Sequence, residues 1–360
     1  MKENLNLFIM VIFVLLTVLP VVSAPVYKEV SNVDELYKAI ESIVPDSNDG
    51  AYIKINPGVY LIEKPLYMKN VNMVKIEGSG WNTLLKKVGD GDLMVFEGIC
   101  WNNSVTDLML EGDINAKTGS GLVLKEGKWN GINAIERCYF VRFPEHGVKA
   151  EGKKDTPISC ITVKSCWFIE NKEDQLYFAY SNDYYILENQ FGRGGKAGCY
   201  LYNSSAGSYS LNYHWDNKTA LKMSNDCHFT RIENNRFEES YETGIIMGDK
   251  DDSKGAVALT IFTGNTIHSN SKNNYGKFNA IEMYNIRDII FNNNQVFSWN
   301  YVDSSVKHCL TVSDNSTGVM IKDNIFRHHT EDALIYPKDN ESFIVKDNMI
   351  DSNMPAQEVK

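Results

Sequence analysis

The feature that most constrains this chain is an eight-residue pattern that recurs along it and whose sixth residue is usually asparagine. In the copy "TRIENNRF" (230–237), Asn235 holds the sixth position and Phe237 the eighth. Asparagine is unfavourable in helix interiors and in strands, so its regular return needs a structural reason. The sixth positions of the eight copies are Cys138, Cys166, Asn189, Asn235, Asn265, Asn294, Asn324 and Asn348.

These positions are spaced 23 to 30 residues apart, except for one interval of 46 residues with Asn212 at its midpoint. A period of this length indicates stacked structural repeats. Between the asparagines lie segments such as "TGIIM" (243–247), in which a small residue precedes an apolar, variable, apolar triplet. That alternation predicts a short strand preceded by a tightly packed position. In "QLYFA" (175–179), the pattern places Leu176 at the small position and Phe178 on the outer face.

The repeats show no apolar periodicity of helical length, so their strands can pair only by stacking in parallel at ~4.8 Å per coil. This predicts an all-β solenoid of about ten or eleven coils. We expect the asparagines to stack at one corner, to adopt the left-handed turn conformation and to pass amide hydrogen bonds between coils. Cys138 and Cys166 share this column and are interpreted as packing residues, and Phe237 and Phe326 are expected to be buried.

The two ends of the chain suggest how it is organised. Residues 1–24 combine a lysine, an apolar run and the small pair Ser23-Ala24, which is typical of a secretory signal; an uncleaved anchor is the alternative. Residues 25–50 contain an amphipathic helix over 32–44 that would cap the solenoid, residues 51–350 form the coils, and 351–360 form a tail. We therefore expect a secreted or cell-surface protein with no transmembrane segment once the signal is removed.

The composition limits the kinds of ligand and cofactor that we expect. The formal net charge is −10 without a basic stripe, which argues against nucleic acid as a ligand. The seven cysteines form neither a disulfide framework nor a C-x-x-C metal pair. Five N-x-S/T sequons give weak support to export. The oligomeric state stays open.

The segment "VDELYKAIES…AYIKINPGVYLIEKPLYMKNVNMVKIEGSGWNTLLK" (33–86) resembles the opening of right-handed parallel β-helix proteins of the pectate-lyase-like superfamily. With the asparagine repeats, the resemblance extends over about residues 32 to 350. It implies a right-handed parallel β-helix whose ligands lie along the outer face of the strand that follows the longer loop. The signatures of polygalacturonase-like hydrolases and the Arg-x-Pro-x-x-Arg segment of many pectate lyases are absent. The fold hosts many activities, so it does not specify a reaction.

Three constellations and a set of sugar-binding residues on or beside that face are candidate sites. Glu242 and Glu282 come from neighbouring coils and could form the carboxylate pair of a glycosidase. His308 and Asp332 lie one coil apart in one column, with Glu331 beside them, and could form a general base or bind a metal. The aromatic and cationic residues suited to sugar binding are Tyr200, Tyr202, Lys222 and Tyr284. The loop "GDKDDS" (248–253) gathers Asp249, Asp251 and Asp252, a candidate Ca²⁺ site, although no cofactor is required.

These observations favour a protein that acts on a polysaccharide, by hydrolysis or by lyase chemistry, in a groove over the 243–333 coils. A non-catalytic, adhesin-like glycan-binding solenoid and a structural surface protein are the alternatives. Catalysis needs at least two ionisable groups that converge on the groove, whereas binding needs only aromatic and hydroxyl partners.

Overall fold

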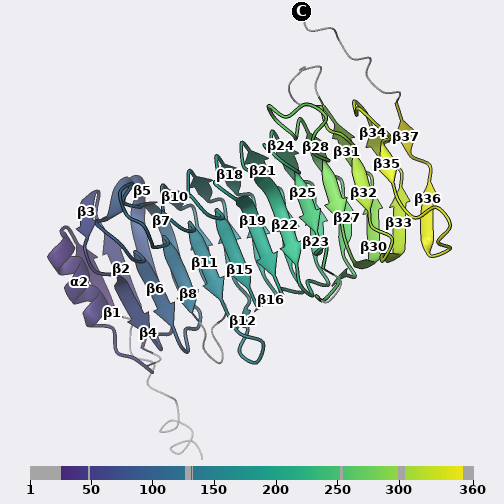
Figure 1. Ribbon diagram of the computed structural model, residues 1–360. Helices are drawn as coiled ribbons and strands as arrows, with labels where there is room; N and C mark the ends of the chain where they lie inside the picture. The colour runs from purple at the N-terminus through teal and green to yellow at the C-terminus, as the bar shows by residue number, and fades with distance from the viewer. Residues whose placement is uncertain are drawn as a thin grey trace, which may run out of the picture.

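The computed structural model describes residues 26–47, 49–125, 131, 133–251, 254–298 and 305–351. The predicted signal at 1–24, Asp252 and nearly all of the predicted tail therefore lie outside the described residues. The chain forms an elongated solenoid whose coils follow one another from the N-terminal helix to the C-terminal strands (Figure 1). Every pairing between named strands is parallel.

The first coils and their cap are built from one helix and five strands. The helix is α2 (Val33–Glu41). The strands are β1 (Val26–Val30), β2 (Ala51–Ile55), β3 (Gly58–Ile62), β5 (Val74–Lys87) and β7 (Ser104–Glu111). The Asn32 side chain caps α2 by accepting a hydrogen bond from the Glu35 backbone N–H, and Glu35 accepts one from the Ser31 N–H in return.

Leu36, Ala39 and Ile40 turn the helix's apolar face into the core. The helix ends three residues earlier than predicted, and Val44 is exposed rather than on the packed face. Strand β1, which the sequence pattern did not predict, pairs in parallel with β2.

One strand of each coil belongs to an 11-stranded sheet. Its strands, in spatial order, are β4 (Leu66–Lys69), β6 (Met94–Glu97), β8 (Leu122–Lys125), β11 (Val148–Glu151), β15 (Leu176–Ala179), β19 (Ala197–Tyr202), β22 (Thr219–Ser224), β25 (Ile245–Met247), β29 (Ile281–Met283), β32 (Leu310–Val312) and β35 (Leu334–Ile335). One strand per coil confirms the predicted solenoid of parallel coils. Figure 1 shows these strands on the face nearest the viewer.

The asparagine corner separates two further strand columns, which join into a bent 24-stranded sheet. The strands before the corner are β9 (Ala134–Glu136), β13 (Thr162–Lys164), β17 (Tyr185–Leu187), β20 (Ser208–Ser210), β23 (Arg231–Glu233), β27 (Ile261–Thr263), β30 (Ile286–Asn292), β33 (Thr317–Lys322) and β36 (Phe343–Lys346). Those after it are β10 (Tyr139–Val141), β14 (Trp167–Ile169), β18 (Gln190–Gly192), β21 (Tyr213–Trp215), β24 (Arg236–Glu238), β28 (Thr266–His268), β31 (Gln295–Phe297), β34 (Ile325–Phe326) and β37 (Met349–Ile350). Three further strands, of two residues each, are β12 (Ile158–Ser159), β16 (Ser181–Asn182) and β26 (Val257–Ala258).

The predicted asparagine ladder is present and continuous. The Asn235 side-chain oxygen accepts hydrogen bonds from the Asn212 backbone N–H at 2.9 Å and from its side-chain amide at 3.1 Å. The Asn235 amide in turn donates to Asn265 at 2.9 Å, and the same contacts repeat through Asn294. Cys138 and Cys166 are buried in the same column, with a free thiol each. Each buried amide is thus paired along the ladder, which meets the cost of burying polar groups.

One part of the turn prediction was wrong. The residue with left-handed backbone is the one before the ladder position, not the ladder asparagine itself. It is Asn234 at φ 56° and Asn293 at φ 55°, but also Glu188 at φ 59° and Leu211 at φ 59°. The ladder asparagine is therefore explained by its amide hydrogen bonds, because the turn accepts several residue types one place earlier.

The solenoid interior is a set of stacked apolar columns. Phe237 and Phe326 are fully buried, as predicted. Phe262 stacks on Phe291 with ring centroids 5.1 Å apart, and Phe140 stacks on Phe168 at 5.0 Å. Such repeated contact between identical positions ties each coil to its neighbours.

Candidate functional site

The outer face of the 11-stranded sheet carries one central side chain per strand. The strand register places these side chains in a column: Tyr67, Val95, Val123, Lys149, Tyr177, Tyr200, Lys222, Ile246, Glu282, Thr311 and Ile335. The prediction that Phe178 points outward was wrong. Leu176 aligns with Val148 and Cys199, so Tyr177 points outward and Phe178 is fully buried.

The shift of one residue occurs because Gln175 occupies the position that is small in other coils. The corresponding Gly147 is so crowded that a Cβ there would lie 2.7 Å from the Phe168 ring. Gln175 is tolerated because its buried amide binds the Asn171 side chain and the Gly192 carbonyl. The pattern alone could not anticipate that a polar residue would be satisfied inside this corner.

Four consecutive members of the column, Lys149, Tyr177, Tyr200 and Lys222, form what we call the Tyr–Lys row. The rings of Tyr177 and Tyr200 are 5.3 Å apart, and the Lys222 ammonium lies 4.4 Å from the centre of the Tyr200 ring. The Tyr200 hydroxyl is 2.8 Å from the Ser224 hydroxyl. The structure thus places the predicted residues Tyr200 and Lys222 together.

Tyr202 flanks this row, since its ring lies 6.3 Å from Tyr200 and 5.8 Å from Tyr180. Tyr180 directly follows β15, and Tyr200 and Tyr202 belong to β19. Neighbouring aromatic rings next to a cation form a surface suited to the C–H faces and acidic groups of sugars.

A histidine and a carboxylate lie directly beside this row. His146 precedes β11 and Asp174 precedes β15, and both side chains are almost fully buried. The His146 Nδ1 lies 3.1 Å from the Asp174 backbone carbonyl oxygen, which can only accept, so this nitrogen carries the proton and Nε2 keeps a lone pair. The Tyr177 ring stacks on the imidazole with centroids 5.1 Å apart.

Burial moves the pKa values of these two groups in opposite directions. It lowers the pKa of His146 to about 4, because the imidazolium would be desolvated. It raises the pKa of Asp174 to about 6, although the Ala197 N–H and nearby lysines favour its charged form. Burial also raises the pKa of Tyr177 to about 12, so its hydroxyl stays protonated. At neutral pH this cluster presents a neutral imidazole, an ionised carboxylate and a phenol.

Three lysines lie around the His146–Asp174 pair. Lys149 and Lys196 disfavour the charged imidazolium, and Lys196 and Lys222 lower the pKa of Asp174. Lys149 also pairs with Glu151 at 3.1 Å, and Lys196 pairs with Glu173. Lys222 faces the tyrosine ring without an ion pair recorded for it among the described residues.

The predicted carboxylate pair makes separate contacts. Glu282 accepts hydrogen bonds from Thr243 at 3.2 Å, Asn279 at 2.9 Å and the Tyr284 hydroxyl at 2.5 Å. Burial, together with the bond to Glu282, raises the pKa of Tyr284. Glu242 instead faces Lys218 at 3.5 Å. Each carboxylate thus has its own partners, and a shared acid–base role is not supported by these contacts.

The predicted histidine cluster repeats the backbone arrangement of His146. The His308 Nδ1 lies 2.7 Å from the Asp332 backbone carbonyl, and its Nε2 lies 3.5 Å from Glu331. The structure therefore brings His308, Glu331 and Asp332 together, as expected. The column beside them holds Thr311 and Ile335 in place of the two tyrosines.

The loop predicted to bind Ca²⁺ is only partly described. Asp249 accepts a hydrogen bond from the Asn225 N–H at 3.1 Å and lies 3.5 Å from the Lys254 ammonium. Asp252 lies outside the described residues. Within the described part of the chain, no group of three or more His, Cys, Asp or Glu side chains is arranged to hold a metal ion.

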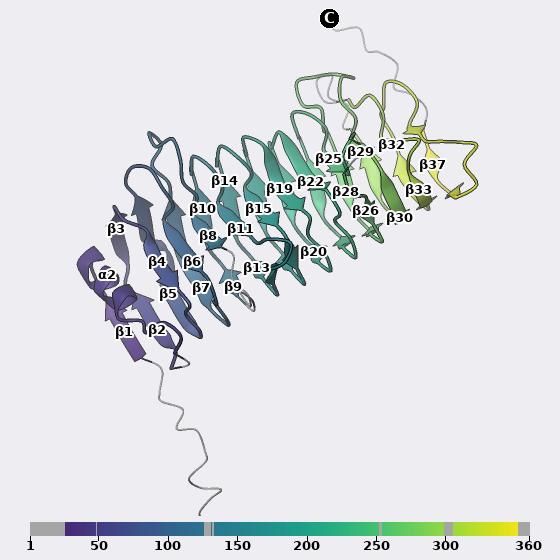
Figure 2. The ribbon, with the colours of Figure 1, turned by 60° about the horizontal axis from the view of Figure 1, so that its bottom comes forward.

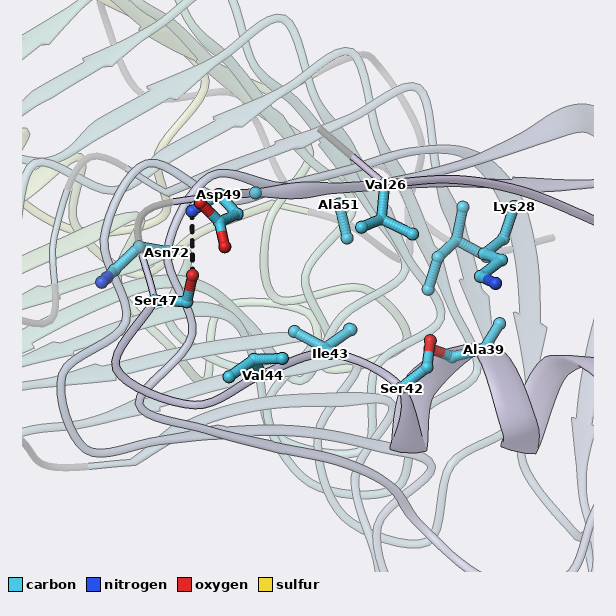
Figure 3. A pocket seen from close by; sticks show the side chains of 12 residues that line it. Val26, Lys28, Ala39, Ser42, Ile43, Val44, Ser47, Asp49, Ala51 and Asn72 are labelled. Carbon is cyan, nitrogen blue, oxygen red and sulfur yellow. Dashed lines mark hydrogen bonds between the residues drawn. The ribbon is translucent and has the colours of Figure 1, made fainter. Parts of the chain in front are cut away.

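Two cavities lie away from this face, at the ends of the solenoid. The first, of ≈ 40 Å³, lies under the helix and is lined by residues such as Ile43, Ala51 and Ile53 (Figure 3). Its few polar groups include Ser47 and Asp49, which hydrogen-bond to each other, so it is a packing gap beneath the cap. The second, of ≈ 680 Å³, opens at the last coil beside Asp332 and Tyr336.

His146 and Asp174 are not among the candidate residues predicted from the sequence. The usable signal was their position two residues before the strand in successive coils, the same relation as His308 and Asp332. Tyr177 was missed because of the one-residue shift at Gln175.

Comparisons with known proteins agree with this architecture. Residues 120–296 match the family described as "Right handed beta helix region". No curated protein matches the sequence. The tailspike protein of Dettilon superposes with a TM-score of 0.64 at 11% identity, over 88% of this chain and 64% of that one. This chain therefore spans less than two thirds of that tailspike.

Two enzymes share the fold over most of their length. The A-module of a mannuronan C-5 epimerase from Azotobacter vinelandii gives a TM-score of 0.62 at 14% identity, covering 89% of this chain and 95% of that one. A DFA-IIIase from Arthrobacter chlorophenolicus, without its lid, gives 0.55 at 10% identity, covering 91% and 98%. The chain therefore has the right-handed parallel β-helix fold. In the residues that the structure describes, no helix has the length and hydrophobicity to span a bilayer.

Proposed function

We propose that this protein acts on a uronate-containing polysaccharide bound along the Tyr–Lys row, by removing the proton α to the uronate carboxyl group. The observation that carries the proposal is the His146–Asp174 pair: two nearly buried groups with oppositely displaced pKa values, with the Tyr177 ring stacked on the imidazole and lysines nearby. Perturbed groups of this kind concentrate at functional sites. The likeness to a mannuronan epimerase supports the fold and agrees with the substrate class.

Each group has a role that its environment suits. Lys149, whose charge acts on His146 from the same coil, binds the uronate carboxylate and stabilises the negative charge that develops as the proton leaves. Lys222, three strands farther along the row, binds the carboxylate of another uronate of the same polymer. His146 Nε2 takes the proton, since the imidazole is neutral and its Nδ1–H is held by a carbonyl. Tyr177, protonated at neutral pH, is the acid. Asp174 faces the imidazole and favours its protonated intermediate, with its carboxylate oxygen 3.8 Å from Nδ1.

In the cleavage reaction, the electron pair left on the ring carbon forms a double bond to the neighbouring ring carbon. The bond from that neighbour to the glycosidic oxygen breaks, and Tyr177 donates its proton to the leaving oxygen. The imidazolium then returns a proton to the tyrosinate through water. If a proton instead returns to the opposite face of the first carbon, the sugar is epimerised without chain cleavage. Both outcomes share the first step, which is the step proposed.

The experiment incubates the protein with mannuronan, polygalacturonate and neutral inulin. Ultraviolet absorbance reports unsaturated products, reducing ends report cleavage, and deuterium uptake from D2O reports proton exchange. We expect exchange or unsaturation on a uronate polymer, and loss of both in His146→Gln. Cleavage of inulin, or of a uronate polymer without unsaturation or exchange, would contradict the proposal.

Location and cofactors complete the proposal. The predicted signal at 1–24 supports a location outside the cell, where polymeric glycans are found. The reaction drawn here requires no cofactor, and parallel assays with Ca²⁺ and with a chelator test whether the loop at Asp249 and Asp251 contributes. A signal that remains attached would leave the same β-helix at the cell surface.

Non-catalytic glycan binding is the second candidate. The observation that favours it is that Tyr177, Tyr200, Tyr202 and Lys222 form a binding surface that needs no acid–base pair. In that case no polymer would be turned over, His146→Gln would bind like the wild type, and Tyr200→Ala would lose binding.

A further inference from the structure

A second set of exposed rings lies on a different face of the solenoid. It consists of Trp81, Tyr139, Trp167, Tyr213 and Trp215, which we call the aromatic stripe. Trp81 lies 5.3 Å from Tyr139 and 5.9 Å from Trp167 between ring centroids. Trp167 lies 6.4 Å from Trp215, which stacks on Tyr213 at 5.0 Å. The rings thus form one continuous chain of contacts.

The scaffold shapes this stripe. Tyr139, Trp167, Gln190 and Tyr213 occupy one register position in β10, β14, β18 and β21, so the stripe follows the solenoid axis for about 14 Å, three steps of ~4.8 Å. Gly192 faces Trp215, and a Cβ at Gly192 would lie 2.3 Å from the indole. The glycine therefore lets the indole lie against the sheet.

Exposure shows that these rings are available. Trp81 is 60% exposed, and the other four are half-buried, resting on the sheet with one side open. A single exposed aromatic residue is ordinary, but five in mutual contact on one face are a candidate interaction surface.

Paired charges border the stripe. Arg142 contacts Glu111 at 3.1 Å, and Arg193 contacts Glu170 at 2.9 Å. At the far end, the Arg236 guanidinium lies 5.0 Å from the Tyr213 ring and donates to Glu238 at 2.7 Å. Burial would raise the pKa of Glu238, but hydrogen bonds from His268 and Tyr213 outweigh it and lower the pKa. The rings are therefore flanked by fixed hydrogen-bonding groups without a net excess of one charge.

Four of the five stripe residues, all except Trp81 of β5, occupy the same coils as the Tyr–Lys row. Strands β10, β14, β18 and β21 lead directly into β11, β15, β19 and β22, whose outer residues are those of the row. Figure 1 shows β18 and β21 at the upper edge, next to β19 and β22, and Figure 2 shows β10 and β14 beside β11 and β15. The two surfaces are on adjacent faces of the same four turns.

We propose that the aromatic stripe is an auxiliary polysaccharide-binding site, which holds a second stretch of the polymer that the Tyr–Lys row processes. Flat rings in single file, with hydrogen-bonding groups along the edges, suit the C–H faces and hydroxyls of a linear sugar chain. A protein partner is a poorer fit, because a single file of five rings is a narrow surface, whereas each partner contributes ~800 Å² to a stable interface. The ligand class rests on the proposed function, but the site does not rest on the catalytic step.

Two surfaces on one rigid scaffold bind a long polymer more tightly than either alone, because the second contact is intramolecular. A short oligosaccharide reaches only one surface and gains nothing from the other. The stripe therefore affects the affinity for polymer, and the row affects turnover of polymer and oligomer alike.

The test compares Trp81→Ala and Trp81→Ala/Trp167→Ala with the control Tyr185→Ala, which removes a 49% exposed ring from β17 outside the stripe. Native gels containing mannuronan, polygalacturonate or inulin measure affinity, and far-ultraviolet circular dichroism checks folding. We expect polymer affinity to fall about 3- to 10-fold per ring removed, with turnover of a mannuronate tetramer unchanged. The control keeps wild-type affinity.

The outcomes separate the two proposals. If the folded double variant binds polymer as tightly as the wild type, the stripe is not a polysaccharide-binding site, even if His146→Gln is inactive. Loss of affinity in the double variant, with no turnover by the wild type, keeps the stripe and overturns the catalytic proposal. Absence of binding of the wild type to all three polymers overturns the stripe. Concentration-dependent self-association of the wild type that the double variant abolishes, measured by sedimentation velocity, also overturns it in favour of a contact between two copies.

Discussion

His146 and His308 stand at equivalent places of the solenoid, yet their surroundings differ. Each precedes its strand by two residues, and each holds its Nδ1 against the backbone carbonyl of an aspartate in the next coil, at 3.1 Å for His146 and 2.7 Å for His308. Beside His146 lie Tyr177, Tyr200 and lysines; beside His308 lie Thr311, Ile335 and Glu331. The hydrogen bond between the histidine and the aspartate carbonyl is therefore a property of the repeat. The side chains on the outer face decide which of the two histidines can take part in catalysis.

The packing of the solenoid interior also differs between the central coils, around Phe237, and the last coil, around Phe326. This difference predicts the largest effect, which is on the free energy of unfolding. Phe237 contacts the rings of Tyr209, His214 and Phe262, whereas Phe326 contacts Phe291 alone among the described aromatic residues. We expect Phe237→Ala to cost ~3–5 kcal/mol through the cavity it leaves. Phe326→Ala should cost less, because the last coil can relax. Chemical unfolding measures both, and an equal loss would show that the terminal coil is as tightly coupled as the centre.

The histidines give the most direct test of the comparison. His146→Gln should lower kcat by ~10²-fold or more, since the amide cannot take up the proton. His308→Gln should change kcat by less than about tenfold, because no tyrosine or unpaired lysine adjoins it. Turnover of the active uronate polymer measures both variants. The reverse order of effects would return the chemistry to the C-terminal coils and to the predicted residues Glu282 and Asp332.

The aspartates differ in burial, which predicts different effects on stability. Asp174 is nearly buried and Asp332 is exposed. Because the folded pKa of Asp174 is about 6, above its ordinary value, ionisation destabilises the fold above pH 6 and this cost disappears as pH falls to about 4. Asp174→Asn should thus stabilise the protein at pH 7.5 by up to ~3 kcal/mol while lowering activity. Asp332→Asn should change stability by less than ~0.5 kcal/mol.

Asp174→Asn should also reveal how protonation of His146 lowers the stability of the fold at acidic pH. Its folded pKa of about 4 is below the ordinary value, so stability is lost as pH falls from about 6.5 to 4. In the wild type, the opposite contribution of Asp174 partly offsets this loss. Thermal unfolding of Asp174→Asn between pH 7 and 4 should therefore be steeper than that of the wild type. Parallel curves would mean that the carboxyl is not desolvated.

The smallest effect expected is on substrate binding. Lys222→Met should raise KM for a uronate polymer by about tenfold, because the carboxylate loses one unscreened cation. Lys250, which lies 5.0 Å from the Tyr284 ring near Glu282, is the matched lysine of the C-terminal region, and Lys250→Met should leave KM unchanged. Equal effects of the two variants would extend the binding surface across both regions.

The sequence by itself determined the architecture. The asparagine column and the small-apolar alternation recur in every coil, and a repeat that buries its face only by stacking leaves few alternatives, so Asn235 and Phe237 were placed correctly. Only the tertiary structure decided which way the side chains of the outer face point and what surrounds them. Gln175 shifts one strand by a residue because its amide finds partners in the corner, and this turns Tyr177 outward. Burial then separates the pKa values of His146 and Asp174, and burial depends on neighbours 23 to 30 residues away in the chain, whose packing no local pattern records.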